Sequence, residues 1–217
     1  MAVIALGVLV SGSGTNLQAI LDAIDAGKLD AKVAIVVSNV AGAGALERAT
    51  SRGIPTRVID HRGFADRAAF DAALVAELRA YGSQYVVLAG FMRILTKTLL
   101  DAFPARVVNV HPALLPAFPG VDAQEQALRY GVRIAGCSVH FVDAGTDTGP
   151  IIAQAAVPVL ETDDTASLRS RILEKEHELL PRVLQWLAEG RVTVEAREGA
   201  RPLVRIAGVA CASLGTT

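Results

Sequence analysis

The sequence of 217 residues is poor in cysteine and in aromatic residues. Its two cysteines, Cys137 and Cys211, are too few for a disulfide framework and lack metal-ligand spacing, which favours a reducing compartment. Aromatic residues make up 5% of the chain and hydrophobic residues 52%, so we expect a core of Val, Ile, Leu and Ala. Such a core is typical of a parallel sheet that helices cover on both faces.

The sequence also lacks an apolar run of the roughly 18 residues that a membrane helix needs. The apolar start at residues 3–10 has no basic leader and runs into a glycine turn, so it predicts a buried strand rather than a signal peptide. With 21 basic and 22 acidic residues, the net charge of −1 gives no support for a nucleic-acid surface or a basic membrane patch. We expect a cytoplasmic protein with neither nucleic acid nor membrane as partner.

Short apolar runs alternate with helical patterns through the first half. The expected strands are residues 2–10, 32–38, 56–60, 85–90 and 106–111, and the expected helices are residues 16–26, 45–52, 66–81 and 97–103. This alternation predicts βαβ units, and hence an α/β fold with a doubly wound, mostly parallel sheet that is Rossmann-like in its N-terminal half.

The pattern changes after Pro112, where three further prolines exclude a helix or a central strand. The remaining expected elements are a helix at 124–130, strands at 137–143 and 151–159, a helix at 165–189 and a hairpin at 192–206. We predict one domain over residues 1–206, with about seven strands and an antiparallel edge toward the C-terminus. Its halves are residues 1–105 and 106–206, and a flexible tail follows at 207–217.

The glycine-rich stretch "SGSGTN" at 11–16 lies between the first strand and the first helix. That arrangement presents backbone N–H groups and a helix dipole to an anion, and Asn16 can cap the helix. The dinucleotide fingerprint requires glycine where this chain has Leu17, and an acidic residue where its second strand ends in Ser38 and Asn39. The remaining candidate ligand of this turn is the phosphate of a small substrate. The glycines could instead serve only to form a tight turn.

The stretch "NVHP" places Asn109 and His111 on one face of a strand, at its carboxyl end. An amide can donate to the oxyanion of a tetrahedral intermediate while an imidazole moves a proton, which suits acyl transfer to an amine. Asp147, in the turn "GTDTG", can orient the imidazole. The alternatives are a packed histidine and an ordinary turn aspartate. The histidines lack metal-ligand spacing, so we expect no metal.

Seven segments resemble the glycinamide ribonucleotide formyltransferases, which are folate-dependent enzymes of purine synthesis. The segments are "SGSGTNLQAI", "VVSN", "LAGFMRIL", "NVHPALLPAFPG", "SVHF", "DTGPI" and "KEH". The resemblance runs from about residue 4 to residue 189. It departs at Ala113 and Ala117, where relatives often carry serine and a polar or basic residue, and it suggests a cis peptide before Pro116.

The resemblance implies transfer of a formyl group from N10-formyltetrahydrofolate to the amine of glycinamide ribonucleotide. We expect a monomer or a homodimer. The implied catalytic residues are Asn109, His111 and Asp147. The substrate would contact Gly12, Ser13, Gly14, Thr15, Asn16 and Glu176. The folate would contact Arg67, Met92, Arg93, Ile94, Leu95, Asn109, Asp143, Ala144, Gly145, Thr146 and Asp147. His140 would be at most a neighbour of this site.

Other functions remain open at this point. A methionyl-tRNA formyltransferase is expected to add a nucleic-acid-binding domain and a basic surface. A formyltetrahydrofolate hydrolase would use water in place of the amine and usually carries a regulatory domain in front. From a different class, a non-catalytic module could bind a phosphorylated metabolite through the glycine turn alone.

Overall fold

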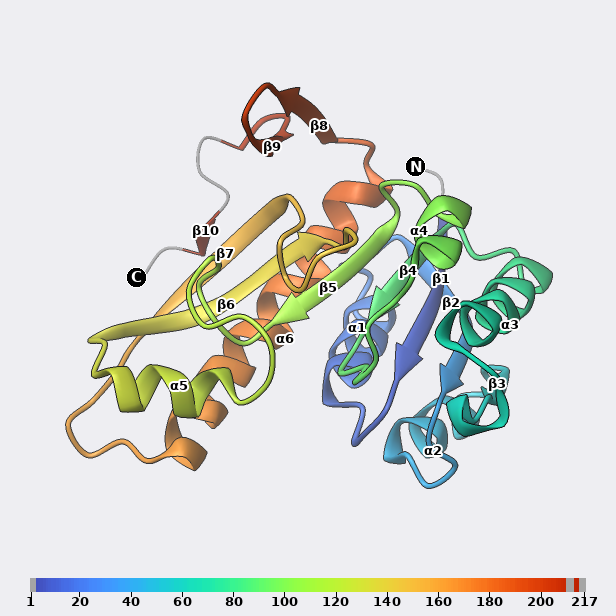
Figure 1. The fold of residues 1–217 in the computed structure, drawn as a ribbon, viewed down its shortest axis with the longest axis horizontal. Helices are drawn as coiled ribbons and strands as arrows, with labels where there is room; N and C mark the ends of the chain where they lie inside the picture. The colour runs from blue at the N-terminus through green and yellow to red at the C-terminus, as the bar shows by residue number, and fades with distance from the viewer. Residues whose placement is uncertain (1–2, 210–212, 215–217) are drawn as a thin grey trace. The chain divides into compact units, whose positions relative to one another are not determined.

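A computed structural model describes residues 3–209 and 213–214 (Figure 1). The chain divides into two compact units, Met1–Asn109 and Val110–Thr217. The division falls within strand β5 (Val107–His111), four residues from the predicted boundary between the halves.

The first unit is built on parallel strands. They are β1 (Ile4–Val10), β2 (Ala31–Ser38), β3 (Thr56–Val58), β4 (Tyr85–Leu88) and the start of β5. Their order is β5-β4-β1-β2-β3, and every neighbouring pair is parallel. All seven residues of β1 are buried, so other elements cover both of its faces. The predicted parallel α/β architecture is confirmed.

Four α-helices and a short 3-10 helix belong to this unit. They are α1 (Thr15–Asp25), α2 (Gly44–Thr50), η1 (His61–Gly63), α3 (Arg67–Ala80) and α4 (Lys97–Ala102). Helices α1 and α2 contact β2, and α3 packs beside α4, as Figure 1 shows in green and teal. Helix α3 also approaches β1 closely, because a Cβ atom at Gly7 would lie 2.2 Å from the Cδ2 atom of Leu78.

Local predictions were wrong at several element ends in this unit, among them the fourth strand, which ends at Leu88 rather than at Gly90. Asn16 does not cap the first helix, because α1 already begins at Thr15 and its N-cap is Gly14, whose φ of 76° only glycine adopts easily. The third strand ends at Val58 rather than at Asp60. The Asp60 carboxylate accepts a hydrogen bond from the Arg62 N–H and so starts η1 instead.

The second unit contains an antiparallel pair, β6 (Ile134–Phe141) and β7 (Ile151–Pro158), and β10 (Ser213–Leu214) pairs with β7 in parallel. Strands β8 (Val192–Arg197) and β9 (Ala200–Ile206) form a separate hairpin. The predicted antiparallel edge and terminal hairpin are confirmed. The bounds predicted for β6 were wrong, because pairing with Pro158 starts this strand at Ile134.

Two helices complete the second unit, α5 (Ala123–Tyr130) and α6 (Thr165–Ala188). Helix α6 contacts β6 and β7, and its N-terminus carries a capping box between Asp164 and Ser167. Within the predicted tail, β10 is an added strand, while residues 210–212 and 215–217 lie outside the described residues, as does Cys211. The flexibility of that tail stays a prediction.

We predict that Gly7→Ala destabilises the protein by about 1–3 kcal/mol, because the new methyl group would overlap Leu78 and Ser83 and push α3 away from β1. Urea denaturation measures the change. Gly42→Ala is the matched control, since a Cβ atom there meets nothing within 4 Å. Equal stability of Gly7→Ala and the wild type would contradict the close packing of α3 on β1.

Candidate active site

The glycine turn packs its two glycines differently. A Cβ atom at Gly14 would lie 2.5 Å from the Cβ atom of Ala45, so a side chain does not fit there. A Cβ atom at Gly12 would meet nothing within 4 Å. The turn therefore packs against α2 at Gly14 and leaves open space at Gly12. Thr15 and Asn16 form the first residues of α1, so their backbone N–H groups belong to the helix N-terminus.

Ser11 ties the glycine turn to the segment predicted to hold the folate. Its N–H donates to the Gly90 carbonyl at 3.1 Å, and its Oγ accepts from the Met92 N–H at 2.9 Å. The same hydroxyl donates to Asn39 Oδ1 at 2.6 Å, which fixes its direction. The position of Met92 thus depends on the residue that begins the turn.

The four residues from Met92 to Leu95 differ in exposure. The side chains of Met92 and Ile94 are 68% and 56% exposed, Arg93 is half-buried, and Leu95 is buried. Exposed large apolar side chains that lie close together are typical of a ligand or partner surface. This arrangement is compatible with the predicted folate contacts.

Arg67, another predicted folate contact in the first unit, is the first residue of α3. It lies near the buried carboxylate of Asp71, which accepts hydrogen bonds from the N–H and the hydroxyl of Thr96. Burial raises the pKa of Asp71, and these hydrogen bonds together with the charge of Arg67 partly offset that effect. Arg67 therefore lies in the electrostatic environment of the segment that ends at Leu95.

In the second unit the predicted pair of His111 and Asp147 comes together. His111 Nδ1 lies 3.4 Å from Asp147 Oδ2; the His111 side chain is buried, at 5% exposed, and that of Asp147 is largely buried, at 12%. A second imidazole joins them, since His140 Nε2 lies 3.6 Å from Asp147 Oδ1. The carboxylate thus has one histidine at each oxygen. Asn109, two residues before His111 on β5, is half-buried.

The other nitrogen of each imidazole faces a backbone carbonyl. His111 Nε2 lies 2.8 Å from the Phe118 oxygen, and His140 Nδ1 lies 2.9 Å from the Phe141 oxygen. A carbonyl oxygen only accepts hydrogen bonds, so these two nitrogens carry protons. The nitrogens that face Asp147 then carry a proton only when the ring is protonated. A backbone carbonyl therefore sets the neutral tautomer of each ring.

The backbone at Asp147 is held in an uncommon conformation. Its φ of 55° lies in the left-handed region, where a residue with a side chain is strained. The Gly120 N–H donates to Asp147 Oδ2 at 2.8 Å, and Arg201 Nη2 lies 3.4 Å from the Asp147 carbonyl oxygen. These contacts aim the carboxylate at the two histidines.

The proline-rich loop that follows His111 is fixed by a cross-strand pair of side chains. Ser138 and Gln154 lie opposite each other on β6 and β7. Ser138 Oγ accepts from the Leu115 N–H and donates to the Ala113 carbonyl, and Gln154 Nε2 donates to the Leu115 carbonyl. The Leu115–Pro116 peptide is cis, as the resemblance suggested. The loop thus presents the Phe118 carbonyl to His111.

The turn between β6 and β7 carries the remaining predicted folate contacts. Asp143 Oδ1 accepts from the Gly145 N–H at 3.1 Å and from the Thr148 hydroxyl at 2.7 Å. Ala144, Gly145 and Thr146 are exposed. The turn is thus held by its own hydrogen bonds and leaves three residues open to a ligand.

Glu176, which the resemblance assigns to the ribose, is buried on α6. Burial together with the negative charge of Glu176 raises the pKa of the Cys137 thiol to about 12. Cys137 therefore stays a neutral core residue, as predicted from its place on the strand. The ribose contact of Glu176 stays a prediction.

Comparison with known proteins gives this arrangement a family. The sequence profile described as formyl transferase matches residues 5–184. The chain is 44% identical over 185 residues to phosphoribosylglycinamide formyltransferase of Escherichia coli. The match covers 85% of this chain and 87% of that protein. It also superposes on the crystal structure of glycinamide ribonucleotide transformylase 1 from Symbiobacterium toebii, with a TM-score of 0.90, 53% identity and 94% of each chain covered. The chain belongs to the formyl transferase family.

Other relatives are much longer than this formyl transferase. The trifunctional purine biosynthetic protein adenosine-3 of Drosophila melanogaster is 47% identical over 191 residues, and the match covers 87% of this chain but 14% of that protein. The resemblance seen in the sequence and the predicted α/β class are confirmed by these matches.

Within residues 3–209 and 213–214, no group of three or more His, Cys, Asp and Glu side chains could hold a metal ion. No helix in that part of the formyl transferase is long and apolar enough to cross a membrane.

The sequence reasoning missed most of the residues that support the predicted ones. His140 contacts Asp147 more directly than expected, and its place in "SVHF", two residues after Ser138, was the available signal. Gln154 had no signal of its own, because its bonds reach a loop 39 residues earlier. The role of Asn39 was equally hidden, 28 residues from Ser11.

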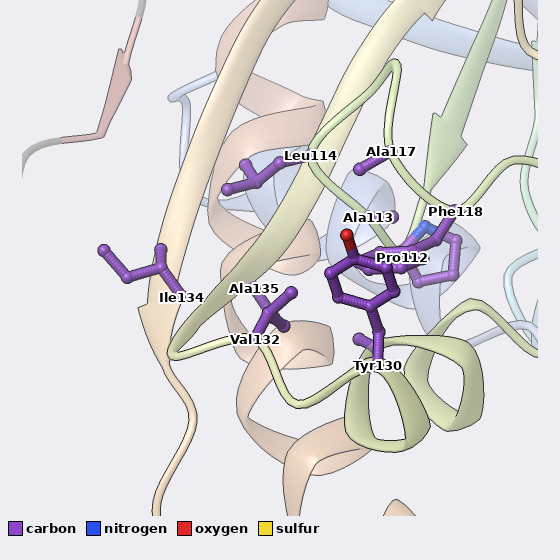
Figure 2. A pocket seen from close by; sticks show the side chains of 10 residues that line it. Pro112, Ala113, Leu114, Ala117, Phe118, Tyr130, Val132, Ile134 and Ala135 are labelled. Carbon is purple, nitrogen blue, oxygen red and sulfur yellow. The ribbon is translucent and has the colours of Figure 1, made fainter.

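An apolar cavity of about 450 Å³ adjoins the proline-rich loop (Figure 2). Its lining is Pro112, Ala113, Leu114, Ala117, Phe118, Ala127, Tyr130, Val132, Ile134 and Ala135. Figure 2 shows Tyr130 of α5 facing the loop, and its ring lies 5.8 Å from that of Phe118 in an edge-on contact. The two departures from the family pattern, Ala113 and Ala117, thus both line this cavity with small side chains.

We predict that alanine affects stability at one glycine of the turn and ligand binding at the other. Gly14→Ala should lower stability by more than about 1–2 kcal/mol, because its positive φ and its contact with Ala45 both disfavour a side chain. Gly12→Ala should fold normally and weaken binding of a phosphorylated ligand. Thermal unfolding and ligand titration of both variants check this. Equal loss of stability in both would contradict the geometry of the turn.

We also predict that His111 titrates below its ordinary pKa. Burial lowers the pKa of His111 from 6.5, while the Asp147 carboxylate and the Phe118 carbonyl partly offset that effect. Asp147→Asn removes a charge that raises this pKa, so the midpoint should fall further. The pKa of Asp147 is itself lowered, since hydrogen bonds from His140 and Gly120 and the charges of both histidines outweigh its burial.

NMR titration of the imidazole signals, assigned with a His111→Gln variant, measures these midpoints. Asp143→Asn is the matched control, because it removes a carboxylate from the same turn and should leave His111 unchanged. A midpoint that rises in Asp147→Asn would contradict the assigned electrostatics.

Proposed function

We propose that this formyl transferase moves a formyl group from N10-formyltetrahydrofolate to the primary amine of glycinamide ribonucleotide. The observation that carries the proposal is the match to phosphoribosylglycinamide formyltransferase of Escherichia coli over 85% of this chain and 87% of that protein. The products would be formylglycinamide ribonucleotide and tetrahydrofolate.

The chemistry requires attack of the amine nitrogen on the formyl carbon. A tetrahedral intermediate forms, and it collapses when the bond between N10 and the formyl carbon breaks. The amine loses one proton and N10 gains one, so the site must move a proton without net uptake. His111 is suited to this transfer, because its imidazole lies beside the Asp147 carboxylate and can accept and release a proton.

The oxygen of the formyl group becomes anionic in that intermediate. Asn109 is suited to donate to it, since it lies two residues from His111 on β5. The phosphate of the ribonucleotide would bind the turn at Gly12, Ser13 and Gly14, with Thr15 and Asn16 at the start of α1. Glu176 would hold the ribose. The folate would contact Arg67, the segment from Met92 to Leu95 and the turn from Asp143 to Asp147.

The proposal extends to the setting of the reaction. Residues 1–206 would act as one domain, as a monomer or homodimer, on small-molecule substrates in the cytoplasm. Support comes from the chain's similarity to proteins whose names place them in purine biosynthesis and from the near-neutral charge.

The test is the absorbance change on deformylation of N10-formyltetrahydrofolate, with and without glycinamide ribonucleotide. We expect turnover only with the ribonucleotide. His111→Ala and Asp147→Ala should lower kcat by about 10²- to 10⁴-fold, and Asn109→Ala by about 10²- to 10³-fold. Asp101→Asn, an exposed change on α4, serves as the control that keeps activity.

Two other outcomes would replace the proposal. Turnover that does not require the ribonucleotide would identify a hydrolase of the formyl-folate. No turnover, with ligand binding that persists in His111→Ala, would identify a non-catalytic module that binds a phosphorylated metabolite.

A further inference from the structure

The carbonyl groups of the glycine turn are held by the next helix along the chain. The Ala45 N–H of α2 donates to the Gly12 carbonyl at 3.1 Å. One turn later on that helix, Arg48 Nε donates to the Ser13 carbonyl at 2.9 Å. Both carbonyls of the turn's centre therefore face α2, and within residues 3–209 and 213–214 the N–H groups of Ser13 and Gly14 donate to no backbone carbonyl.

Arg48 is itself held in place by α1. Its Nη1 donates to Gln18 Oε1 at 3.0 Å, and Gln18 Nε2 in turn donates to Asp22 Oδ1 at 2.7 Å. The guanidinium is half-buried and bridges the turn and the helix that follows it. Its orientation is thus fixed by two neutral oxygen atoms.

Arg48 and its neighbour Arg52 differ in how their positive charges are paired. Arg52 forms ion pairs with Asp22 and Asp25. No carboxylate within the described part of the chain pairs with Arg48. A positive charge with only neutral partners, fixed beside an anion-binding turn, attracts an anion more strongly than a neutralised one.

We propose that Arg48 is the positioning residue of the phosphate turn and supplies its positive charge. It turns the Ser13 carbonyl away from the ligand, so that N–H groups rather than an oxygen face the phosphate. Its charge favours the doubly charged phosphate from behind the turn. This inference rests on the proposed function, because it names the residue that selects the phosphorylated substrate at the same site.

The test compares three variants. Arg48→Met removes the charge and the donors but keeps the stem, and Arg48→Lys keeps the charge without the fork of donors. Arg52→Met is the matched control, since it removes a neutralised cation four residues later on the chain. Thermal unfolding first establishes that each variant folds.

Calorimetric titration with ribose 5-phosphate gives a readout that needs no catalysis. We expect Arg48→Met to bind about 10-fold more weakly and with less dependence on ionic strength, Arg48→Lys to recover part of the loss, and Arg52→Met to match the wild type. In the formyl transfer assay, Arg48→Met should raise KM for glycinamide ribonucleotide by a similar factor and leave kcat within about 2-fold.

Equal ribose 5-phosphate affinity in Arg48→Met and wild type would overturn the role of Arg48 and leave the proposed reaction standing. Weaker binding in Arg48→Met without any ribonucleotide-dependent turnover would support Arg48 and overturn the reaction. A wild-type protein that binds neither phosphorylated compound would overturn both.

Discussion

The second unit of this formyl transferase is organised around one buried carboxylate. Asp147 has a histidine at each oxygen and a loop N–H at Oδ2, and its side chain is only 12% exposed. A charge in such a place is costly unless nearby polar groups compensate for the lost water. The strained backbone at Asp147, the fixed orientation of His111 and the course of the proline-rich loop all follow from that requirement.

The proline-rich loop supplies backbone hydrogen bonds to the Asp147 carboxylate and to His111. Its prolines cannot join a sheet ladder, so its backbone polar groups need other partners. Ser138 and Gln154 satisfy those near Leu115, which leaves the Phe118 carbonyl to orient His111 and the Gly120 N–H to contact Asp147. The histidine's tautomer is therefore set by a residue seven positions away, and that residue is held by a strand pair still further along the chain.

Much of this fold could be predicted from the sequence because its signals are local. The alternation of apolar runs and helical patterns is complete within each βαβ unit, and the glycine turn lies between two clear elements. The errors arose where two neighbouring residues could each take the same structural role. Gly14 caps α1 where Asn16 was expected, because a left-handed glycine already ends the turn one residue before the helix.

The catalytic candidates could be predicted only in part. His111 and Asp147 stand in short motifs with chemical meaning, and the resemblance joined them. His140, Gln154 and Arg48 could not be placed in the same way, because each acts on a residue to which no local pattern connects it. Their contacts with Asp147, the proline-rich loop and the glycine turn form only when the strands and helices are assembled.

The two units solve a common problem by the same means. A backbone turn that must present N–H groups, or an imidazole that must present one chosen nitrogen, is ambiguous on its own, since each carries both donors and acceptors. In the first unit α2 occupies the carbonyls of Gly12 and Ser13. In the second, the carbonyls of Phe118 and Phe141 occupy one nitrogen of each histidine. The group left over in each case is the one that the proposed reaction would use, so selectivity at both places would arise from hydrogen bonds within the protein.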